Sequence, residues 1–391
     1  MREPVDLRRQ RILAAVQARG AARVSDLATE LAVSVVTLRR DVEELARTGK
    51  LRRGHGTVRP ILPEQDAGQG RERTEGAASA LDPAPDGGPV AVVVPERHAY
   101  LYEMLHGART AFEEAGVRIA LHIAPAAPGA EQPIVERALA DGARALLIAP
   151  RWRSRATEED DYAWLARVDV PTVVMERRPR RGSAVHAVDT VCTDHWYGVH
   201  LAVEHLTGLG HRRIVLAARD DSPTARAVRA AFTEIAAEHP RVDKWALALS
   251  SPSATADADE AAGHSGKPLD LPSLLGELGA TGALLHGDVD ALMLVQSLRD
   301  AGLRVPEDCS AIAYDDVVAG LGGTPLTAVS PPKAEIGRTA AELLLRRLGE
   351  QAAGGPAGPA HRVQVLPTLK VRGSTRSAPY RDPVPSTPAA Q

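Results

Sequence analysis

From Val90 onward, short aliphatic runs rich in β-branched residues alternate with longer amphipathic segments. This alternation constrains the fold most, because strands that alternate with helices build parallel sheets covered by helices on both faces. The predicted strands are VAVVV, VRIALHI, ALLIAP, PTVVM, AVDTV, RIVLAA, KWALAL, GALLH and SAIAY. The predicted helices lie in EMLHGARTAFEEAG, YGVHLAVEHLTGLG, TARAVRAAFTEIAAEH, DALMLVQSLRDAG and EIGRTAAELLLRRLG. So much α/β sequence exceeds one typical sheet, which predicts two Rossmann-like subdomains with a ligand-binding cleft between them.

The segment SVVTLRRDVEELARTG predicts a surface helix over residues 35–48. Ser34 is a suitable N-cap, and Gly49 suits the left-handed residue that ends a helix. One narrow stripe is apolar and is expected to pack on a small core; it comprises Val35, Leu38, Val42 and Leu45. The opposite face is expected to be exposed and carries Val36, Arg39, Arg40, Glu43, Glu44 and Arg47.

Two further helices are expected before this one, in RQRILAAVQARG and SDLATEL. Only Ala32-Val33-Ser34 separates the second helix from the third, which predicts a helix-turn-helix corner. The runs LRR and TVR flank Gly54-His55-Gly56 and predict a small hairpin, or wing. Residues 1–60 hold 13 Lys and Arg against 7 Asp and Glu, a net charge of +6, whereas the whole chain is −3. The positive charge is therefore concentrated in the N-terminal segment.

A basic module with an exposed cationic helix and a basic wing predicts binding to double-stranded operator DNA. Arg39 and Arg40 are placed to reach base edges or phosphates from the major groove, and a helix N-terminus suits a phosphate. Two arginines alone could simply belong to a solvent-exposed charged face. Here five features together favour DNA binding: the N-cap, the helix-turn-helix corner, the apolar stripe, the glycine at the helix end and the basic hairpin. The predicted DNA-binding residues are Ser34, Val36, Thr37, Arg39, Arg40, Arg52, Arg53 and His55.

The stretch VSDLATELAVSVVTLRRDVEELARTGKLRRGHGTV resembles the winged helix-turn-helix of DeoR-type transcriptional regulators. The resemblance covers residues 8–59 and rests on the LA, VS, TLRRDV and basic HG motifs. Val36 stands where that family usually has a polar residue, and His55-Gly56-Thr57 replaces the double glycine of the wing. The resemblance implies sequence-specific DNA binding.

Amino-acid composition predicts where the domains end and where linkers, loops and the tail lie. Residues 61–88 are rich in Gly, Pro, Ala and charge, which predicts a flexible linker between a DNA-binding domain at 1–60 and a core at 89–376. Similar stretches predict loops at 252–268 and 351–360 and a disordered tail at 377–391. The chain has only two cysteines, with no apolar signal region and no run of 18 apolar residues, so we expect a cytoplasmic protein without membrane contact.

The core resembles the effector-binding domain of LacI-type regulators, which is similar to type I periplasmic sugar-binding proteins. The resemblance covers residues 90–376 in the family's order. The segments that carry it are HAYLYEMLHGARTAFEEAG, DGARALLIAP, VPTVVMERR, DHWYGVHLAVEHLTGLGHRRIVLAA, GLRVPEDCSAIAYDD, TPLTAVSPPKAEIGRTAAELLLRRL and LPTLKVRGST.

The resemblance implies a small-molecule effector, expected to be a sugar, because strand-end carboxylates suit hydroxyl groups. Gly287 replaces the family's asparagine beside Asp288, and Val228 replaces an arginine, with Arg229 one residue closer to Phe232. Arg151 and Trp152 could supply the missing cation or a stacking surface for the ligand. For each predicted effector residue, the alternative is a surface charge or a contact between subdomains. The predicted effector-binding residues are Tyr100, Leu101, Arg151, Trp152, Glu176, Arg229, Asp288 and Asp315.

Two other kinds of site were weighed. His195, His200, His205 and His211 are spaced by five or six residues, which turns them to different faces of a helix and argues against a metal site. Adjacent carboxylates such as Asp315 and Asp316 rarely converge on one bond, so no catalytic residue, metal or cofactor is expected and the protein is not expected to be an enzyme.

These observations predict a ligand-gated transcriptional regulator, a repressor by resemblance. We expect a homodimer, because one small module makes too few contacts for useful specificity. Two alternatives remain open: a DNA-binding dimer with no sugar effector, and a sugar-binding protein or enzyme whose N-terminal module is incidental.

Overall fold

A computed structural model gives the fold of the chain, which divides into two compact units, Met1–Ala80 and Leu81–Gln391. In the first unit the structure describes Ile12, residues 22–23, Val33, residues 37–38, 40–42, Leu45, and residues 51–53 and 57–60. In the second it describes residues 87–96, 99–125, 127–152, 162–250, 269–354 and 358–379.

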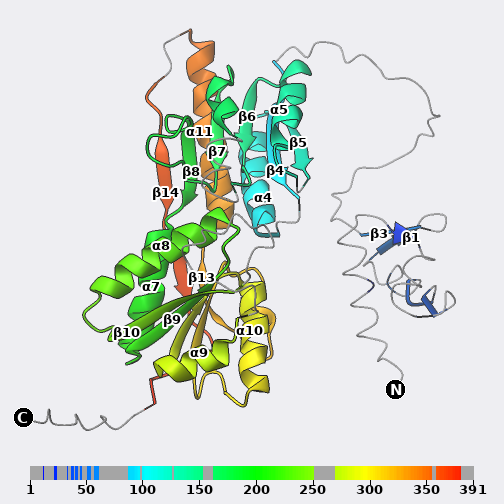
Figure 1. The fold of residues 1–391 in the computed structure, drawn as a ribbon. Coiled ribbons are helices and arrows are strands. Elements are labelled where there is room, and N and C mark those ends of the chain that lie inside the picture. Colours follow the sequence, from blue (N-terminus) through cyan, green and yellow to red (C-terminus); the bar gives the residue numbers. More distant parts are fainter. Residues whose placement is uncertain are drawn as a thin grey trace, which may run out of the picture. The chain divides into compact units, whose positions relative to one another are not determined.

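The first unit contains a three-stranded sheet in the order β1-β3-β2 (Figure 1). The strands β2 (Leu51–Arg53) and β3 (Thr57–Pro60) pair in antiparallel fashion, which confirms the predicted hairpin, and β1 (Ala22–Arg23) pairs with the other edge of β3. Leu38, Val42 and Leu45 are helical and fully or almost fully buried, which confirms these three members of the predicted apolar stripe, whereas Val35 lies outside the described residues. Arg40, on the same helix, is exposed.

Several of the predicted DNA-binding positions cannot be compared with the structure. Ser34, Val36, Arg39 and His55 lie outside the described residues. Thr37 is helical and half-buried, and Arg52 and Arg53 belong to β2.

The second unit has two lobes, each built on a six-stranded sheet (Figure 1). In the first lobe every strand pairing is parallel, in the order β14-β8-β7-β6-β4-β5. Its strands are β4 (Val90–Pro95), β5 (Ile119–Ala124), β6 (Ala145–Ile148), β7 (Thr172–Met175), β8 (Asp189–Thr193) and β14 (Arg362–Val365). Its helices are α4 (Ala99–Glu114), α5 (Glu131–Ala140), the short 3-10 helix η1 (Ala163–Arg167) and α11 (Lys333–Ala352).

The second lobe has the order β10-β9-β11-β12-β13-β15, parallel except for the antiparallel pair of β13 and β15. Its strands are β9 (Arg213–Ala218), β10 (Lys244–Leu249), β11 (Gly282–Leu285), β12 (Ser310–Tyr314), β13 (Thr327–Ser330) and β15 (Thr368–Lys370). Its helices are α7 (His195–Gly208), α8 (Pro223–Glu238), α9 (Leu271–Leu278), α10 (Asp288–Asp300) and the 3-10 helix η3 (Ala319–Leu321).

The chain crosses between the lobes three times, after β8, after β13 and after β14. The first crossing ends at Asp194, whose carboxylate caps α7 by accepting a hydrogen bond of 2.9 Å from the Tyr197 amide. Because each sheet is parallel, the carboxyl ends of its strands lie at one edge, and the crossings leave the first lobe from that edge. The two sets of strand ends therefore face the region between the lobes.

Helices α4 and α11 pack together along one face of the first sheet (Figure 1). A Cβ atom on Gly107 would overlap the carbonyl of Ala334, and one on Gly337 would overlap the carbonyl of Met104. The two glycines therefore permit direct contact between the helix backbones. This close approach fixes α11, which enters from the second lobe, on the core of the first.

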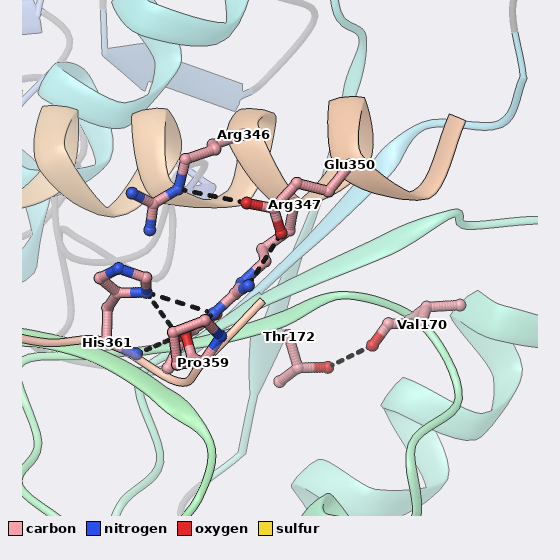
Figure 2. A network of polar contacts seen from close by, with 8 residues as sticks. Val170, Thr172, Arg346, Arg347, Glu350, Pro359 and His361 are labelled. Carbon is pink, nitrogen blue, oxygen red and sulfur yellow. Dashed lines mark hydrogen bonds and ion pairs between the residues drawn. The ribbon is translucent and has the colours of Figure 1, made fainter. Parts of the chain in front are cut away.

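A buried ion pair holds the far end of α11 against the same sheet (Figure 2). Arg347 donates to both carboxylate oxygens of Asp189, at 2.5 and 2.9 Å, and its side chain is 9% exposed. Asp189 also accepts from the His361 amide at 2.5 Å, and Glu350 accepts from Arg347 at 2.8 Å. The network ties α11 to β8 and to the start of β14.

The predicted α/β architecture is confirmed, with element ends shifted by a few residues. Each of the nine predicted strands overlaps a strand of the structure, and each of the five predicted helices overlaps a helix. The helices α5 and α9 and the strands β13, β14 and β15 were not predicted. Among the described residues, none of the helices combines the length and apolarity needed to cross a bilayer.

Parts of the predicted linker, loops and tail lie outside the described residues. This applies to residues 61–86 of the linker, residues 252–268, residues 355–357 and residues 380–391. Of the described remainder, Gly88 packs against the Gly142 carbonyl, and the amide of Ala378 donates to the Leu209 carbonyl at 2.8 Å.

Candidate ligand-binding cleft

Polar and aromatic side chains gather where strand ends of the two lobes meet. Among the described residues, four non-glycine residues have positive φ, namely Trp152, Glu176, Asp315 and Asp316. Glu176 and Asp315 each follow a strand directly, β7 and β12 respectively. Left-handed backbone at such residues costs free energy and concentrates at sites where side chains must be aimed. The strained positions therefore mark these strand ends as the candidate site.

Glu176 is buried and fully engaged with neighbours in its own lobe. Its Oε1 accepts from the Tyr100 hydroxyl at 2.6 Å and from the Thr193 hydroxyl at 2.7 Å, and its Oε2 accepts from the Thr193 amide at 3.0 Å. Burial, followed by the charge of Glu176, raises the pKa of Tyr100 well above its ordinary value. Tyr100 therefore remains a neutral hydroxyl that is held in place by Glu176.

His195 connects Glu176 with the second lobe. Its Nε2 lies 3.7 Å from Glu176 Oε1, and its Nδ1 lies 3.1 Å from the Tyr314 hydroxyl. Burial lowers the pKa of His195, so the ring is neutral near pH 7. The three residues form a polar chain from one lobe to the other.

Tyr314 approaches α7 closely because Gly198 has no side chain. A Cβ atom at position 198 would overlap the Tyr314 hydroxyl oxygen and lie 3.0 Å from Val329 Cγ1. The Tyr314 ring also lies 5.9 Å from the ring of His286, centroid to centroid. His286 directly follows β11 and is 4% exposed.

His286 has two buried ring nitrogens without a hydrogen-bond partner among the described residues. Burial lowers its pKa to about 3, and the nearby His195 ring and Arg219 guanidinium act in the same direction. The imidazole is therefore neutral at physiological pH, with one nitrogen that donates and one that accepts. Unpaired buried groups of this kind are costly, which is why they usually mark a functional site.

Asp315, which follows the neighbouring strand β12, also has a buried polar atom without a hydrogen-bond partner among the described residues. This atom is its Oδ1. Burial, followed by the negative charge of Asp288, raises its pKa to about 7, and the nearby Lys333 opposes the shift. Lys333 is itself buried, with Nζ 5.5 Å from the centre of the Tyr100 ring and 3.9 Å from Glu103.

Other carboxylates at this edge have structural partners. Asp288 Oδ2 accepts from the amides of Val317, Val318 and Ala319 at 2.5, 2.5 and 3.0 Å, which fixes the turn after β12. Asp290 accepts from Arg219 at 3.2 Å. Asp316 pairs with Lys370 and with Arg372, both at 2.7 Å.

The remaining predicted effector residues have varied surroundings. Leu101 is buried in the core of the first lobe. Arg151 is half-buried and donates a long hydrogen bond of 3.5 Å to the Ala124 carbonyl. Trp152 is 1% exposed and packs edge-on against Tyr162, with 6.0 Å between the ring centres. Arg229 is half-buried on α8, and Val228, at the family's arginine position, is fully buried in the second-lobe core.

The structure thus brings Tyr100, Glu176 and Asp315 into one neighbourhood and adds residues that the sequence did not suggest as effector ligands. These additional residues are Thr193, His195, His286, Tyr314 and Lys333. The available signal was their position, since His286, Tyr314 and Thr193 end or follow apolar strand runs. Their proximity depends on contacts between lobes, which no local pattern reveals.

The histidines weighed as metal ligands have other partners. His205 Nε2 lies 3.0 Å from the Thr375 hydroxyl, and His211 contacts the Thr281 hydroxyl at 2.8 Å and the Arg376 carbonyl at 3.0 Å. His200 stacks on Trp196 with 5.5 Å between ring centres. Within the described ranges, no cluster of three or more histidine, cysteine or acidic residues is arranged to hold a metal ion.

Comparison with protein families identifies two domains in this chain. Residues 8–63 match the DeoR-like helix-turn-helix domain, and residues 203–375 match the periplasmic binding protein-like domain. The first match covers the hairpin and buried stripe described above, and the second covers most of the second lobe together with α11.

Curated relatives include transcriptional repressors. The HTH-type transcriptional repressor PurR of Haemophilus influenzae is 30% identical over 211 residues, which cover 53% of this chain and 58% of the relative. The PurR repressor of Erwinia tasmaniensis is 29% identical over 218 residues, covering 55% and 59%. The chain thus spans somewhat more than half the length of the curated relatives it matches.

Solved structures with the same fold include LacI regulators. A LacI transcriptional regulator from a Rhodococcus species is 22% identical with a TM-score of 0.58, covering 74% of this chain and 98% of the other. The lac repressor dimer bound to operator and the anti-inducer ONPF is 20% identical with a TM-score of 0.58, covering 75% and 95%. A LacI family regulator from Enterococcus faecium with bound ribose is 21% identical with a TM-score of 0.52, covering 75% and 100%. The chain joins a DeoR-like helix-turn-helix domain to a periplasmic binding protein-like core with the fold of LacI regulators.

Proposed function

We propose that this protein is a sequence-specific transcriptional regulator, acting as a repressor, whose operator binding changes when a small molecule occupies the cleft. The observation that carries the proposal is the union in one chain of a DeoR-like helix-turn-helix domain and a periplasmic binding protein-like core. Curated relatives named as HTH-type transcriptional repressors support the same role. Such a regulator acts in the cytoplasm, where the DNA is.

The DNA-binding part of the proposal concerns residues 1–60. Arg40 is exposed on a helix whose opposite side, Leu38, Val42 and Leu45, is buried, so its guanidinium is available to DNA. The hairpin β2-β3 is the proposed wing. We assign base or phosphate contacts to Arg39 and Arg40 and backbone contacts to the wing, with Ser34, Val36, Thr37, Arg52, Arg53 and His55 completing the surface.

The sensing part of the proposal concerns the core at 89–376, joined through the linker at 61–88. A ligand between the lobes would contact groups from both of them, because the chain Glu176, His195 and Tyr314 already spans the two. Such a ligand stabilises the arrangement of the two lobes that it binds more tightly, and the size of the shift is set by the difference between its affinities for the two arrangements. Tyr100, Asp315, Arg229, Arg151 and Trp152 are proposed to line the site, Glu176 to position Tyr100, and Asp288 to hold the turn beneath Asp315.

We further propose that the active form is a homodimer. Strand β5 is an edge strand, and its Leu121 and Ile123 are 51% and 60% exposed on one face. On α10, Val289 and Met293 are 58% and 63% exposed and also share a face. Exposed apolar edges of this kind favour association, and the lac repressor of similar fold is described as a dimer on its operator.

Catalysis is not part of this proposal. Three of the adjacent carboxylates are engaged: Asp288 accepts from backbone amides, Asp290 pairs with Arg219, and Asp316 pairs with Lys370 and Arg372. Asp315 keeps one open oxygen, but its neighbour Asp316 is already paired. The two curated relatives described above are repressors.

The experiment is a fluorescence-anisotropy titration of the full-length protein on DNA from its own upstream region and on a scrambled duplex. Wild type is expected to prefer the natural sequence, and Arg40→Ala is expected to weaken that binding without changing the melting temperature. Arg109→Ala is the matched control, because Arg109 is an exposed arginine of the core that pairs with Glu113 at 2.6 Å. Equal binding to both duplexes, or equal loss in both variants, would contradict the proposed DNA-binding surface.

An orphan DNA-binding dimer is the second candidate. The burial of Val228 at the family's arginine position favours it, because that cation is missing from the cleft. Specific DNA binding that no small molecule changes would establish this candidate in place of the ligand-responsive one.

A further inference from the structure

We propose that Asp316 is a positioning residue, which aims Asp315 into the cleft because its own carboxylate is held by an ionic clamp. The ionic clamp consists of Asp316, Ser330, Lys370 and Arg372. The inference rests on the proposed function, in which Asp315 lines the ligand site, and it names the residues that keep this side chain in place.

The turn after β12 begins with two consecutive residues whose backbone is left-handed. The φ angle is 95° at Asp315 and 50° at Asp316. A left-handed backbone costs free energy at any residue with a side chain, although aspartate tolerates it better than most. Such residues persist where neighbouring contacts hold them. The contacts of this turn therefore decide where the side chain of Asp315 points.

Asp316 supplies contacts on one side of the turn. Its side chain is 5% exposed, and its two carboxylate oxygens lie 2.7 Å from Lys370 Nζ and 2.7 Å from Arg372 Nη2. Burial alone would raise the pKa of Asp316, but the hydrogen bonds from the other three members of the ionic clamp outweigh it, so the pKa is lowered. Asp316 is therefore an ionised carboxylate at neutral pH.

The ionic clamp is anchored to the strands that lead to and from the first lobe. Arg372 donates from its amide to the Thr327 hydroxyl at 2.9 Å and from Nη1 to the Leu326 carbonyl at 2.7 Å. Ser330 ends β13, after which the chain leaves the second lobe, and Lys370 ends β15, with which the chain has returned. The turn is thus tied to both of these strands.

The flanking parts of the turn are fixed separately. The Asp315 amide donates to the Val329 carbonyl at 3.1 Å, which continues the pairing of β12 with β13. Asp288 Oδ2 accepts from the amides of the three residues that follow Asp316. Between these fixed points, the ionic clamp holds Asp316 and with it the left-handed peptide that joins it to Asp315.

Asp315 points toward the region where the lobes meet. Its Oδ1 is buried and has no partner among the described residues. The titratable and charged groups that face it come from both lobes and comprise Asp288, Asp290, Lys333, Glu176, Tyr100 and Tyr314. If the turn relaxed to the usual negative φ, the Asp315 carboxylate would rotate out of this buried position toward water.

Removal of Arg372 separates positioning from simple electrostatics, because the two effects on Asp315 have opposite signs. Loss of a nearby positive charge by itself raises the pKa of a carboxyl group. Release of Asp315 into water removes the desolvation that raises its pKa to about 7, so the pKa falls toward its ordinary value. The direction of the change therefore identifies the cause.

The experiment measures melting temperature against pH for the full-length wild type, Arg372→Met and Arg372→Lys, each with and without Asp315→Asn. The part of the pH dependence that Asp315→Asn abolishes reports the titration of Asp315. In wild type this part is a fall in melting temperature as the pH rises from about 4 to about 7, since the folded state holds the proton more tightly. We expect Arg372→Met to lose most of this fall and Arg372→Lys to retain more of it.

Arg304→Met is the matched control, because Arg304 pairs with Asp308 at 2.9 Å in the same lobe but precedes β12. This variant is expected to keep the whole fall. Lys370→Met provides a milder test if Arg372→Met does not melt cooperatively, since the Lys370 side chain is 55% exposed. It is expected to lose part of the fall.

Two results would overturn the positioning role of Asp316. One is an Arg372→Met or Lys370→Met protein in which Asp315 titrates at or above its wild-type pH. The other is a loss of the fall in Arg304→Met equal to that in the clamp variants. Neither result bears on DNA binding, so preference for the upstream duplex would leave the proposed regulator intact while the ionic clamp fails.

Discussion

Replacing Gly198 with alanine probes the contact that joins the lobes. A Cβ atom there would overlap the Tyr314 hydroxyl oxygen and lie 3.0 and 3.1 Å from Val329 Cγ1 and Pro367 Cγ. Pro367 belongs to the segment that crosses between the lobes, so the backbone around the site has little freedom to move away. Tyr314 must therefore shift, which lengthens its 3.1 Å contact with His195.

The expected loss in the free energy of unfolding of Gly198→Ala follows from two opposing effects. Overpacking a tight core costs about 1–3 kcal/mol. The higher helix propensity of alanine returns up to about 1 kcal/mol. Because the Cβ atom would crowd three neighbours, the overpacking cost is expected in the upper part of its range, about 2–3 kcal/mol. The net loss is then about 1–2 kcal/mol, which corresponds to a fall of roughly 2 to 8 °C in melting temperature. The ligand response is expected to weaken as well, since Tyr314 borders both His286 and Asp315.

Gly208→Ala provides the control on the same helix. A Cβ atom at position 208 has nothing within 4 Å, so the substitution gains helix propensity without a clash and is expected to raise the melting temperature slightly. Scanning calorimetry of the two variants and wild type gives the comparison. A Gly198→Ala protein that melts at or above the temperature of wild type would refute the close contact between α7 and Tyr314.

Three further predictions concern the ion pair, the cleft and the dimer. Asp189→Asn should reduce the free energy of unfolding by about 3 kcal/mol because it leaves buried Arg347 uncompensated, whereas Glu350→Gln should cost much less; urea titrations distinguish them. Burial alone would raise the pKa of Asp189, but the hydrogen bonds from Arg347 and the His361 amide outweigh it, so the pKa is lowered. The stabilisation by the Asp189–Arg347 pair should therefore be present above about pH 4 and be lost as the pH falls through the lowered pKa. Asp315 has a raised pKa of about 7, so wild-type stability should fall as the pH rises from about 4 to that value, and Asp315→Asn should remove this slope while retaining DNA binding. Leu121→Arg should yield monomers in sedimentation experiments, and a dimer of unchanged affinity would exclude β5 from the interface.

The sequence predicted the architecture of the core well because that architecture depends on local patterns. Runs such as RIVLAA and KWALAL are long enough to form parallel strands, and both appear as β9 and β10. The strands β14 and β15 were missed because each is short and its residues alternate between half-buried and exposed, so neither shows a continuous apolar run. Helix α9 was missed for its length, since Leu271–Leu278 covers only about two turns.

The candidate site was less predictable from sequence. Glu176 and Asp315 could be named because they follow recognisable strands in segments that resemble a known family. Their different roles depend on partners elsewhere, Glu176 being engaged by Tyr100 and Thr193 while Asp315 Oδ1 stays open. His286 ends the run GALLH and gives no local sign of burial or of missing partners. Its importance emerges only from its three-dimensional surroundings, next to Tyr314.

The proposed sugar-responsive regulation is tested by a salt-titrated DNA-binding measurement on the full-length protein, with DNA from its own upstream region and with free sugars added one at a time. Because phosphate contacts make affinity fall steeply with salt, specific and non-specific binding separate along the titration. We expect the protein to prefer the upstream sequence over a scrambled duplex, and we expect its affinity for that sequence to change with at least one free sugar. Binding without sequence preference at every salt concentration, or specific binding that no free sugar alters, would contradict a sugar-responsive regulator.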